Sequence, residues 1–106
     1  MLRFRSVAIA CALLAGAVLG DEAKAADPIK IGELNSYTGL PAFTLPYRQG
    51  MQLAADEINA RGGVLGRKLE LVIRDDAGKP EDAVRIAGEL VTNEKVALLA
   101  GTFFSH

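Results

Sequence analysis

The chain contains few of the residues on which cross-links, metal sites and catalytic triads depend. Its 106 residues include one cysteine, one histidine and no tryptophan. A single cysteine, Cys11, allows no disulfide within the chain and no metal site made of several thiolates. The histidine, His106, has no cysteine, second histidine or acidic cluster near it in the sequence. We therefore expect no metal site and no catalytic triad.

The chain also lacks an excess of positive charge. It has 12 Lys and Arg against 13 Asp and Glu, which gives a formal net charge of −1. Proteins that bind nucleic acid or an anionic membrane surface present a basic patch. We therefore expect no nucleic-acid partner and no polybasic attachment to a membrane.

A glycine-rich phosphate-binding loop is absent as well. The glycine cluster GGVLG, residues 62–66, follows a predicted helix and precedes a predicted strand. Phosphate-binding loops have the opposite order, because the helix N-terminus holds the anion. The first strand–helix loop, residues 36–39, has one glycine and neither dinucleotide-binding nor Walker spacing. The cluster is predicted to be a turn, and no cofactor is expected.

The first 25 residues have the pattern of a secretory signal peptide. Arg3 and Arg5 precede an apolar run at residues 7–19, and Ala23 and Ala25 form a small-residue cleavage site. A membrane anchor is the alternative, but the run has 13 residues, whereas a bilayer span needs about 20. Cleavage after Ala25 predicts a periplasmic protein with two parts, a signal peptide at 1–25 and a domain at 26–106.

Three segments are predicted to be strands. Residues 29–35 alternate apolar and polar side chains, and residues 69–73, which follow a turn, are apolar except for Glu70. Residues 96–100 are apolar throughout, which is typical of a strand covered on both faces by helices.

Two segments between these strands are predicted to be helices. Apolar residues recur at helical spacing over 51–58 and over 83–91. Pro46 suits the first turn of the first helix and Gly62 its left-handed end cap. Pro80 suits the start of the second helix.

This order of elements predicts an α/β fold, a βαβαβ unit with a parallel sheet. In such sheets ligands bind at the carboxyl ends of the strands. Here those ends are the loops at residues 36–45 and 75–79 and the chain from residue 101 onward.

Six residues at this edge of the predicted sheet are candidate ligand-binding residues. Hydroxyls and backbone N–H groups there can hold a carboxylate, and an aromatic ring can cover an apolar ligand. The alternative is that the Ser and Thr residues are ordinary turn and cap residues. The candidates are Ser36, Tyr37, Thr38, Phe43, Thr102 and Ser105.

Asp75 and Asp76 are candidates for a catalytic carboxylate pair, but adjacent residues at a strand end point in opposite directions. We expect them to be solvated loop carboxylates that can also cap the next helix.

Several short motifs run along the predicted domain. They are IKIG at 29–32, YTG at 37–39, GMQLA at 50–54, EIN at 57–59, GGVLGRK at 62–68, and Asp75, Asp76, Gly78 and Pro80. Together they resemble the amino-terminal lobe of the leucine/isoleucine/valine-type periplasmic substrate-binding proteins of ABC transporters. The stretch at 56–68, followed by the acidic strand end, is the most specific part of the resemblance.

The resemblance implies that residues 26–106 are the incomplete first lobe of a two-lobed clamp. Such a clamp closes over a small solute, such as an amino acid or a related carboxylate or amide, and delivers it to an ABC permease in the inner membrane. In that family a serine after the third strand binds the ligand carboxylate, and an aromatic residue in the first loop often lies against the ligand. Ser105 and Phe43 stand at these places, although the loop at 40–45 is one residue shorter than the common form.

Two other functions remain open at this point. A periplasmic receptor or regulator could use the same lobe for sensing. An exported α/β enzyme would need a nucleophile or an acid–base pair that these residues do not supply. We expect no enzymatic activity.

Overall fold

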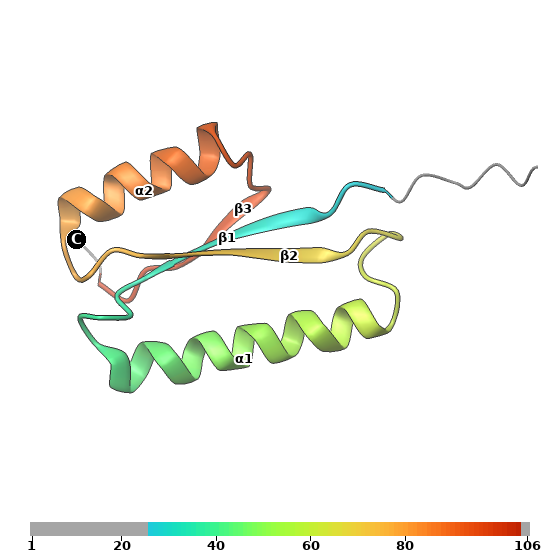
Figure 1. The fold of residues 1–106 in the computed structure, drawn as a ribbon, viewed down its shortest axis with the longest axis horizontal. Helices are drawn as coiled ribbons and strands as arrows, with labels where there is room; N and C mark the ends of the chain where they lie inside the picture. The colour runs from blue at the N-terminus through green and yellow to red at the C-terminus, as the bar shows by residue number, and fades with distance from the viewer. Residues whose placement is uncertain (1–25, 105–106) are drawn as a thin grey trace, which may run out of the picture.

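The computed structural model of the protein describes residues 26–104, so the predicted signal peptide, Ser105 and His106 lie outside the described residues. Within them a three-stranded parallel sheet has one helix on each face (Figure 1). The elements are β1 (Ile29–Asn35), α1 (Pro41–Ala60), β2 (Leu69–Asp75), α2 (Pro80–Thr92) and β3 (Leu98–Gly101). The predicted βαβαβ order and α/β class are confirmed.

The register of the sheet brings the carboxyl ends of all three strands to one edge. The strand order is β2-β1-β3. Asn35, the last residue of β1, pairs with Asp75 at the end of β2, and the neighbouring Leu34 pairs with Gly101 at the end of β3. The loops after the strands are therefore neighbours, as predicted for a ligand-binding edge.

Helix α1 begins five residues before the proline that was predicted to open it. Pro41 occupies the first turn and Pro46 lies inside the helix, so the placement of Pro46 in the first turn is wrong. Both prolines suit a helix start, and the sequence alone does not separate them. The end of the helix is as predicted, because Gly62 has a φ of +104° and donates its N–H to the carbonyl of Asn59.

The strand ends also differ slightly from the prediction. Strand β2 continues to Asp75, and β3 spans Leu98–Gly101, shifted toward the C-terminus. Leu98 is 51 % exposed and Leu99 is 43 % exposed. The expectation that helices cover both faces of this strand is therefore wrong for residues 26–104, because β3 is an edge strand of the described sheet.

The apolar core lies between the sheet and α2. Leu34 of β1 and Val72 of β2 pack with Ile86 and Leu90 of α2, and all four side chains are buried. Successive side chains of a strand point to opposite faces. Since Leu34 faces α2, its neighbours Glu33 and Asn35 face the side of the sheet that α1 covers.

The glycine cluster between α1 and β2 is a turn, as predicted. The N–H of Val64 donates to the carbonyl of Arg67, and the N–H of Arg67 donates to the carbonyl of Val64, at 2.8 and 2.9 Å. A Cβ atom at Gly63 would lie 2.0 Å from the carbonyl oxygen of Arg67. Glycine is therefore required there by the close approach of the backbone.

Candidate functional site

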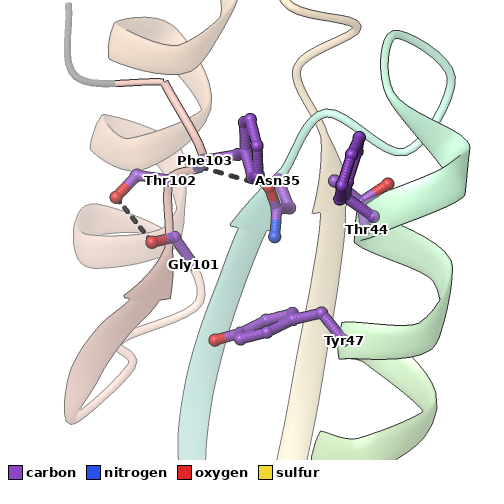
Figure 2. A pocket seen from close by; sticks show the side chains of 7 residues that line it. Asn35, Thr44, Tyr47, Gly101, Thr102 and Phe103 are labelled. Atoms are coloured by element: carbon purple, nitrogen blue, oxygen red, sulfur yellow. Dashed lines mark hydrogen bonds between the residues drawn. The ribbon is translucent and has the colours of Figure 1, made fainter.

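A pocket of about 460 Å³ opens where α1 meets the ends of β1 and β3. Figure 2 shows side chains from α1 and from the segment after β3 lying on either side of Asn35. The pocket lies at the predicted edge of the sheet. Its lining residues are Asn35, Phe43, Thr44, Tyr47, Gly101, Thr102 and Phe103.

Aromatic rings form one wall of this pocket. Phe43, in the first turn of α1, stacks on Phe103 with ring centroids 5.7 Å apart and an interplanar angle of 30°. Phe104 contacts Phe103 edge to face at 5.5 Å. Phe43 and Phe103 are each more than half exposed. Their stacked rings therefore offer an apolar surface to a ligand.

Asn35 ties the end of β1 to the segment that follows β3. Its side-chain oxygen Oδ1 accepts hydrogen bonds from the N–H of Ser36 at 3.0 Å and from the N–H of Phe103 at 3.3 Å. The side chain is almost completely buried. Asn35 therefore fixes the position of the Phe103 backbone, and with it the aromatic wall.

Gly101 and Thr102, which directly precede Phe103, also line the pocket. Gly101 has a φ of +102°, and a Cβ atom there would lie 2.1 Å from the carbonyl oxygen of Leu34. The Thr102 hydroxyl donates to the carbonyl oxygen of Gly101 at 2.6 Å. Thr102 thus lines the pocket, and its role in ligand binding stays a prediction, whereas Ser105 lies outside the described residues.

The other three predicted residues, Ser36, Tyr37 and Thr38, lie beside the pocket and join the β1–α1 loop to the end of β2. The Ser36 hydroxyl donates to Asp76 Oδ1 at 2.5 Å. The N–H of Tyr37 and the hydroxyl of Thr38 donate to the two carboxylate oxygens of Asp75, at 2.9 and 2.7 Å. These three residues shape the loop, and the structure does not place them among the residues lining the pocket.

The charge state of Asp75 reflects these bonds. Partial burial acts to raise the pKa of its carboxyl group, but the Thr38 hydroxyl and the N–H groups of Ala77 and Thr38 outweigh it and lower the pKa below its usual value. Asp75 is therefore a charged acceptor that holds the first loop.

Asp76 is not the solvated carboxylate that the sequence predicts. Its side chain is 6 % exposed, and it accepts hydrogen bonds from the Ser36 hydroxyl and from the N–H of Gly78. The bond to Gly78, two residues on, is an Asx turn that folds the side chain back into the loop. Lys79 is the N-cap of α2 and makes no side-chain cap bond. Asp76 therefore joins two loops and does not cap the helix.

Glu33 is the most unusual residue near the pocket, and sequence reasoning missed it. Its side chain is completely buried, and neither carboxylate oxygen accepts a hydrogen bond of good geometry within residues 26–104, although the Asn35 side chain lies close enough to act on it as a donor. Burial raises its pKa from 4.5 to about 7. The Asn35 side chain and the charge of Arg48 oppose this rise, and the charge of Asp76 adds to it. In the sequence Glu33 is an ordinary polar position of an alternating strand.

Thr44 and Tyr47 were missed for a different reason. Residues 41–45 were predicted to be loop, but they form the start of α1, so a helical face is turned toward the pocket. Thr44 is completely buried, and its hydroxyl contacts the carbonyl oxygens of Ser36 and Leu40 at 3.2 and 3.0 Å. The prolines Pro41 and Pro46 are the signal that could have placed this helix earlier.

The part of the chain that the structure describes holds no group of three or more His, Cys, Asp or Glu side chains able to bind a metal ion. Within the same residues no helix combines the length and apolarity needed to cross a bilayer. The chemistry that the pocket offers is stacking on aromatic rings and hydrogen bonding by amide, hydroxyl and backbone groups.

Comparison with known proteins points to one family. The family model described as periplasmic binding protein matches residues 28–106. An amino acid binding protein of Pseudomonas aeruginosa is 39 % identical over 95 residues, which are 89 % of this chain and 25 % of that protein. The Leu/Ile/Val-binding protein homolog 7 of Brucella suis is 40 % identical over 95 residues, 89 % of this chain and 24 % of that protein. The chain thus spans about a quarter of the length of these relatives.

Solved structures give the same result. The branched-chain amino acid transporter substrate-binding protein LivJ of Streptococcus pneumoniae, in complex with isoleucine, aligns with a TM-score of 0.68 and 38 % identity over 71 % of this chain and 22 % of that chain. A solute-binding protein of an ABC transporter from Rhodopseudomonas palustris, in complex with 3,4-dihydroxybenzoic acid, aligns with a TM-score of 0.60 and 31 % identity over 71 % of this chain and 20 % of that chain.

Proposed function

The chain belongs to the periplasmic binding protein family, and we propose that it forms the first part of the ligand-binding lobe of an ABC importer's solute-binding component. The observation that carries the proposal is the pocket at the carboxyl edge of the parallel sheet, with its aromatic wall. The same edge is where open α/β sheets bind ligands. A second lobe would close over this edge and bury the solute.

We propose an amino acid or a related small carboxylate or amide as the solute. Relatives of this chain are named as amino acid and Leu/Ile/Val-binding proteins, and one structural neighbour holds isoleucine. Phe43 and Phe103 would contact the apolar part of the solute. Ser105, by the family resemblance, would donate its hydroxyl to the solute carboxylate, with Thr102 beside it. Ser36, Tyr37 and Thr38 would act indirectly, through the shape of the first loop.

The proposed role is binding without catalysis. The homologues are solute-binding proteins, and the residues that line the pocket include no nucleophile held by a base. The proposed partner is a permease in the inner membrane. The proposed location is the periplasm, reached by removal of residues 1–25.

Calorimetric titration of the full-length protein that contains this lobe, with a panel of amino acids, tests the proposal. We expect saturable binding with one solute per protein. Phe43→Ala should weaken the binding of an apolar amino acid about tenfold, because one face of the stacked pair is lost. The matched control is Leu53→Ala, which shortens an exposed side chain of α1 that does not line the pocket. Failure of the whole panel to bind, or equal effects of the two substitutions, would reject the proposal.

A further inference from the structure

Aromatic rings are concentrated at the pocket. The chain has four Phe, two Tyr and no Trp, and three of these aromatic residues, Phe43, Tyr47 and Phe103, line the pocket. Phe43 is 62 % exposed, Phe103 is 51 % exposed and Tyr47 is 42 % exposed. Figure 2 shows the Tyr47 ring below Asn35 and Phe103 beside it. The pocket therefore offers exposed ring surface both from α1 and from the segment after β3.

The polar side chains of the pocket are already bonded to the protein. Asn35 Oδ1 accepts two backbone N–H groups. The Thr44 hydroxyl contacts two carbonyl oxygens, and the Thr102 hydroxyl donates to the carbonyl of the residue before it. Among the described residues that line the pocket there is no Asp, Glu, Lys or Arg. Ring surface is therefore the chief contact that this part of the site offers a solute.

The turn that carries Phe103 has an unusual backbone conformation. Gly101 has a φ of +102° and Thr102 has a φ of +60°, and the left-handed region is a genuine outlier for a β-branched residue. The N–H of Thr102 donates to the carbonyl of Leu34 at 2.7 Å. The N–H of Phe103 donates to Asn35 Oδ1 at 3.3 Å. These two bonds to β1 hold the strained turn, and strain of this kind clusters at ligand sites.

The strained turn places the Phe103 ring against two other rings. Its centroid lies 5.7 Å from that of Phe43, at an interplanar angle of 30°, and 5.5 Å from that of Phe104, at 83°. These contacts fix the orientation of the Phe103 ring. Because each aromatic pair needs a centroid separation of about 4.5–7 Å, a third ring does not fit between Phe43 and Phe103. A solute ring would lie on the pocket side of the pair.

We propose that Phe103 makes the site selective for solutes that carry a planar aromatic ring, which would lie against the Phe43–Phe103 pair with Tyr47 beside it. The inference rests on the proposed function and narrows its substrate class from apolar solutes in general to aromatic ones. A pre-positioned ring pair at an uncharged cavity is the feature that such a solute would match, because aromatic rings attract one another beyond the burial of their surface.

Two matched pairs of probes test this by calorimetric titration of the full-length protein. One pair is L-phenylalanine and 3-cyclohexyl-L-alanine, and the other is 3-phenylpropionate and 3-cyclohexylpropionate. The saturated ring is at least as apolar as the aromatic one, so burial of apolar surface alone would not favour the aromatic member. We expect the wild-type protein to bind the aromatic member of a pair about threefold to tenfold more tightly than the saturated one.

Two variants assign this preference to Phe103. Phe103→Leu keeps an apolar side chain but removes the ring, so the preference should fall to about twofold or less. Phe103→Tyr is the matched control, because it keeps the ring face and should keep the preference within about twofold of the wild type.

The wild-type comparison gives a readout that does not depend on how a variant folds. Equal or tighter binding of the saturated members would overturn the inference, and so would a preference that Phe103→Leu leaves unchanged. Binding of L-leucine without binding of either aromatic probe would also overturn it, while leaving the proposed function in place. Binding of no probe and of no amino acid would reject the proposed function and this inference with it.

Discussion

The buried polar side chains at the end of the sheet are informative, because a buried polar group needs a hydrogen-bond partner. Ser36, Asn35 and Asp76 have partners, and their bonds join the loops that follow the three strands. Glu33 has no hydrogen bond of good geometry within the described residues, and only the nearby Asn35 side chain and the charge of Arg48 favour its ionised form. Ser36, Asn35 and Asp76 therefore build the edge of the sheet, whereas Glu33 is a buried carboxyl group whose pKa is raised by its burial.

The burial of Glu33 predicts a pH dependence of stability. Its pKa is about 7 in the folded protein and 4.5 without burial. The folded state therefore holds this proton more tightly, and the stabilisation is present below about pH 4.5 and lost as the pH rises through about 7. Over that range we expect Glu33 to lower the free energy of unfolding by about 1–3 kcal/mol.

Urea denaturation of the solute-free protein at several pH values checks this, with Glu33→Gln as the comparison. The variant cannot ionise at this position, so the fall in its stability between pH 4.5 and 7 should be smaller than in the wild type by that amount. If the free energy of unfolding changes with pH equally in the two proteins, Glu33 titrates at its usual pKa and the prediction is wrong.

Among the elements, the three strands and two helices were predictable from the sequence, since the first strand and both helices have an apolar period and the other two strands are short, mostly apolar segments. Strand β1 and the start of α2 at Pro80 agree with the prediction, whereas the start of α1 was missed because two prolines fit it equally. The apolar run of β3 correctly predicted a strand. It could not predict exposure, because exposure depends on which elements lie beside the strand.

The site was predictable only in part, for a similar reason. The parallel order places the loops at one edge, where Phe43 and Thr102 line the pocket. That they contact a solute stays a prediction. Asp76 looked solvated, because the turn that buries it is formed by long-range pairing with Ser36 as well as by local chemistry. Tyr47 could not be placed without the earlier start of α1.

The bonds between the β1–α1 loop and β2 predict the effect of Asp75→Ala. Asp75 accepts hydrogen bonds from Tyr37, Thr38 and Ala77. Their loss should lower the free energy of unfolding by about 1–3 kcal/mol, since donors lose a charged acceptor. Thermal denaturation measures this. Glu57→Ala, at an exposed position of α1, is the control and should change stability little. Equal effects of the two substitutions would show that the loop is held by other contacts.

At the scale of the whole molecule, the described residues form one side of the proposed binding site. The pocket has walls from α1 and from the segment after β3. The matching segment is about a quarter of the length of the relatives from Pseudomonas aeruginosa and Brucella suis. We propose that the remaining walls come from a second lobe, whose closure supplies the burial that small solutes need.

The central claim, that this edge of the sheet binds the solute, is tested most directly by one comparison. The dissociation constant of the tightest-binding amino acid is measured for the full-length protein and for its Ser105→Ala and Asp76→Asn variants. Ser105→Ala should weaken binding by about 1–3 kcal/mol, because a hydroxyl bonded to the solute carboxylate is lost. Asp76→Asn should weaken it far less, since Asp76 contacts Ser36 and Gly78 and does not line the pocket. Loss of binding in Asp76→Asn with unchanged binding in Ser105→Ala would contradict the account.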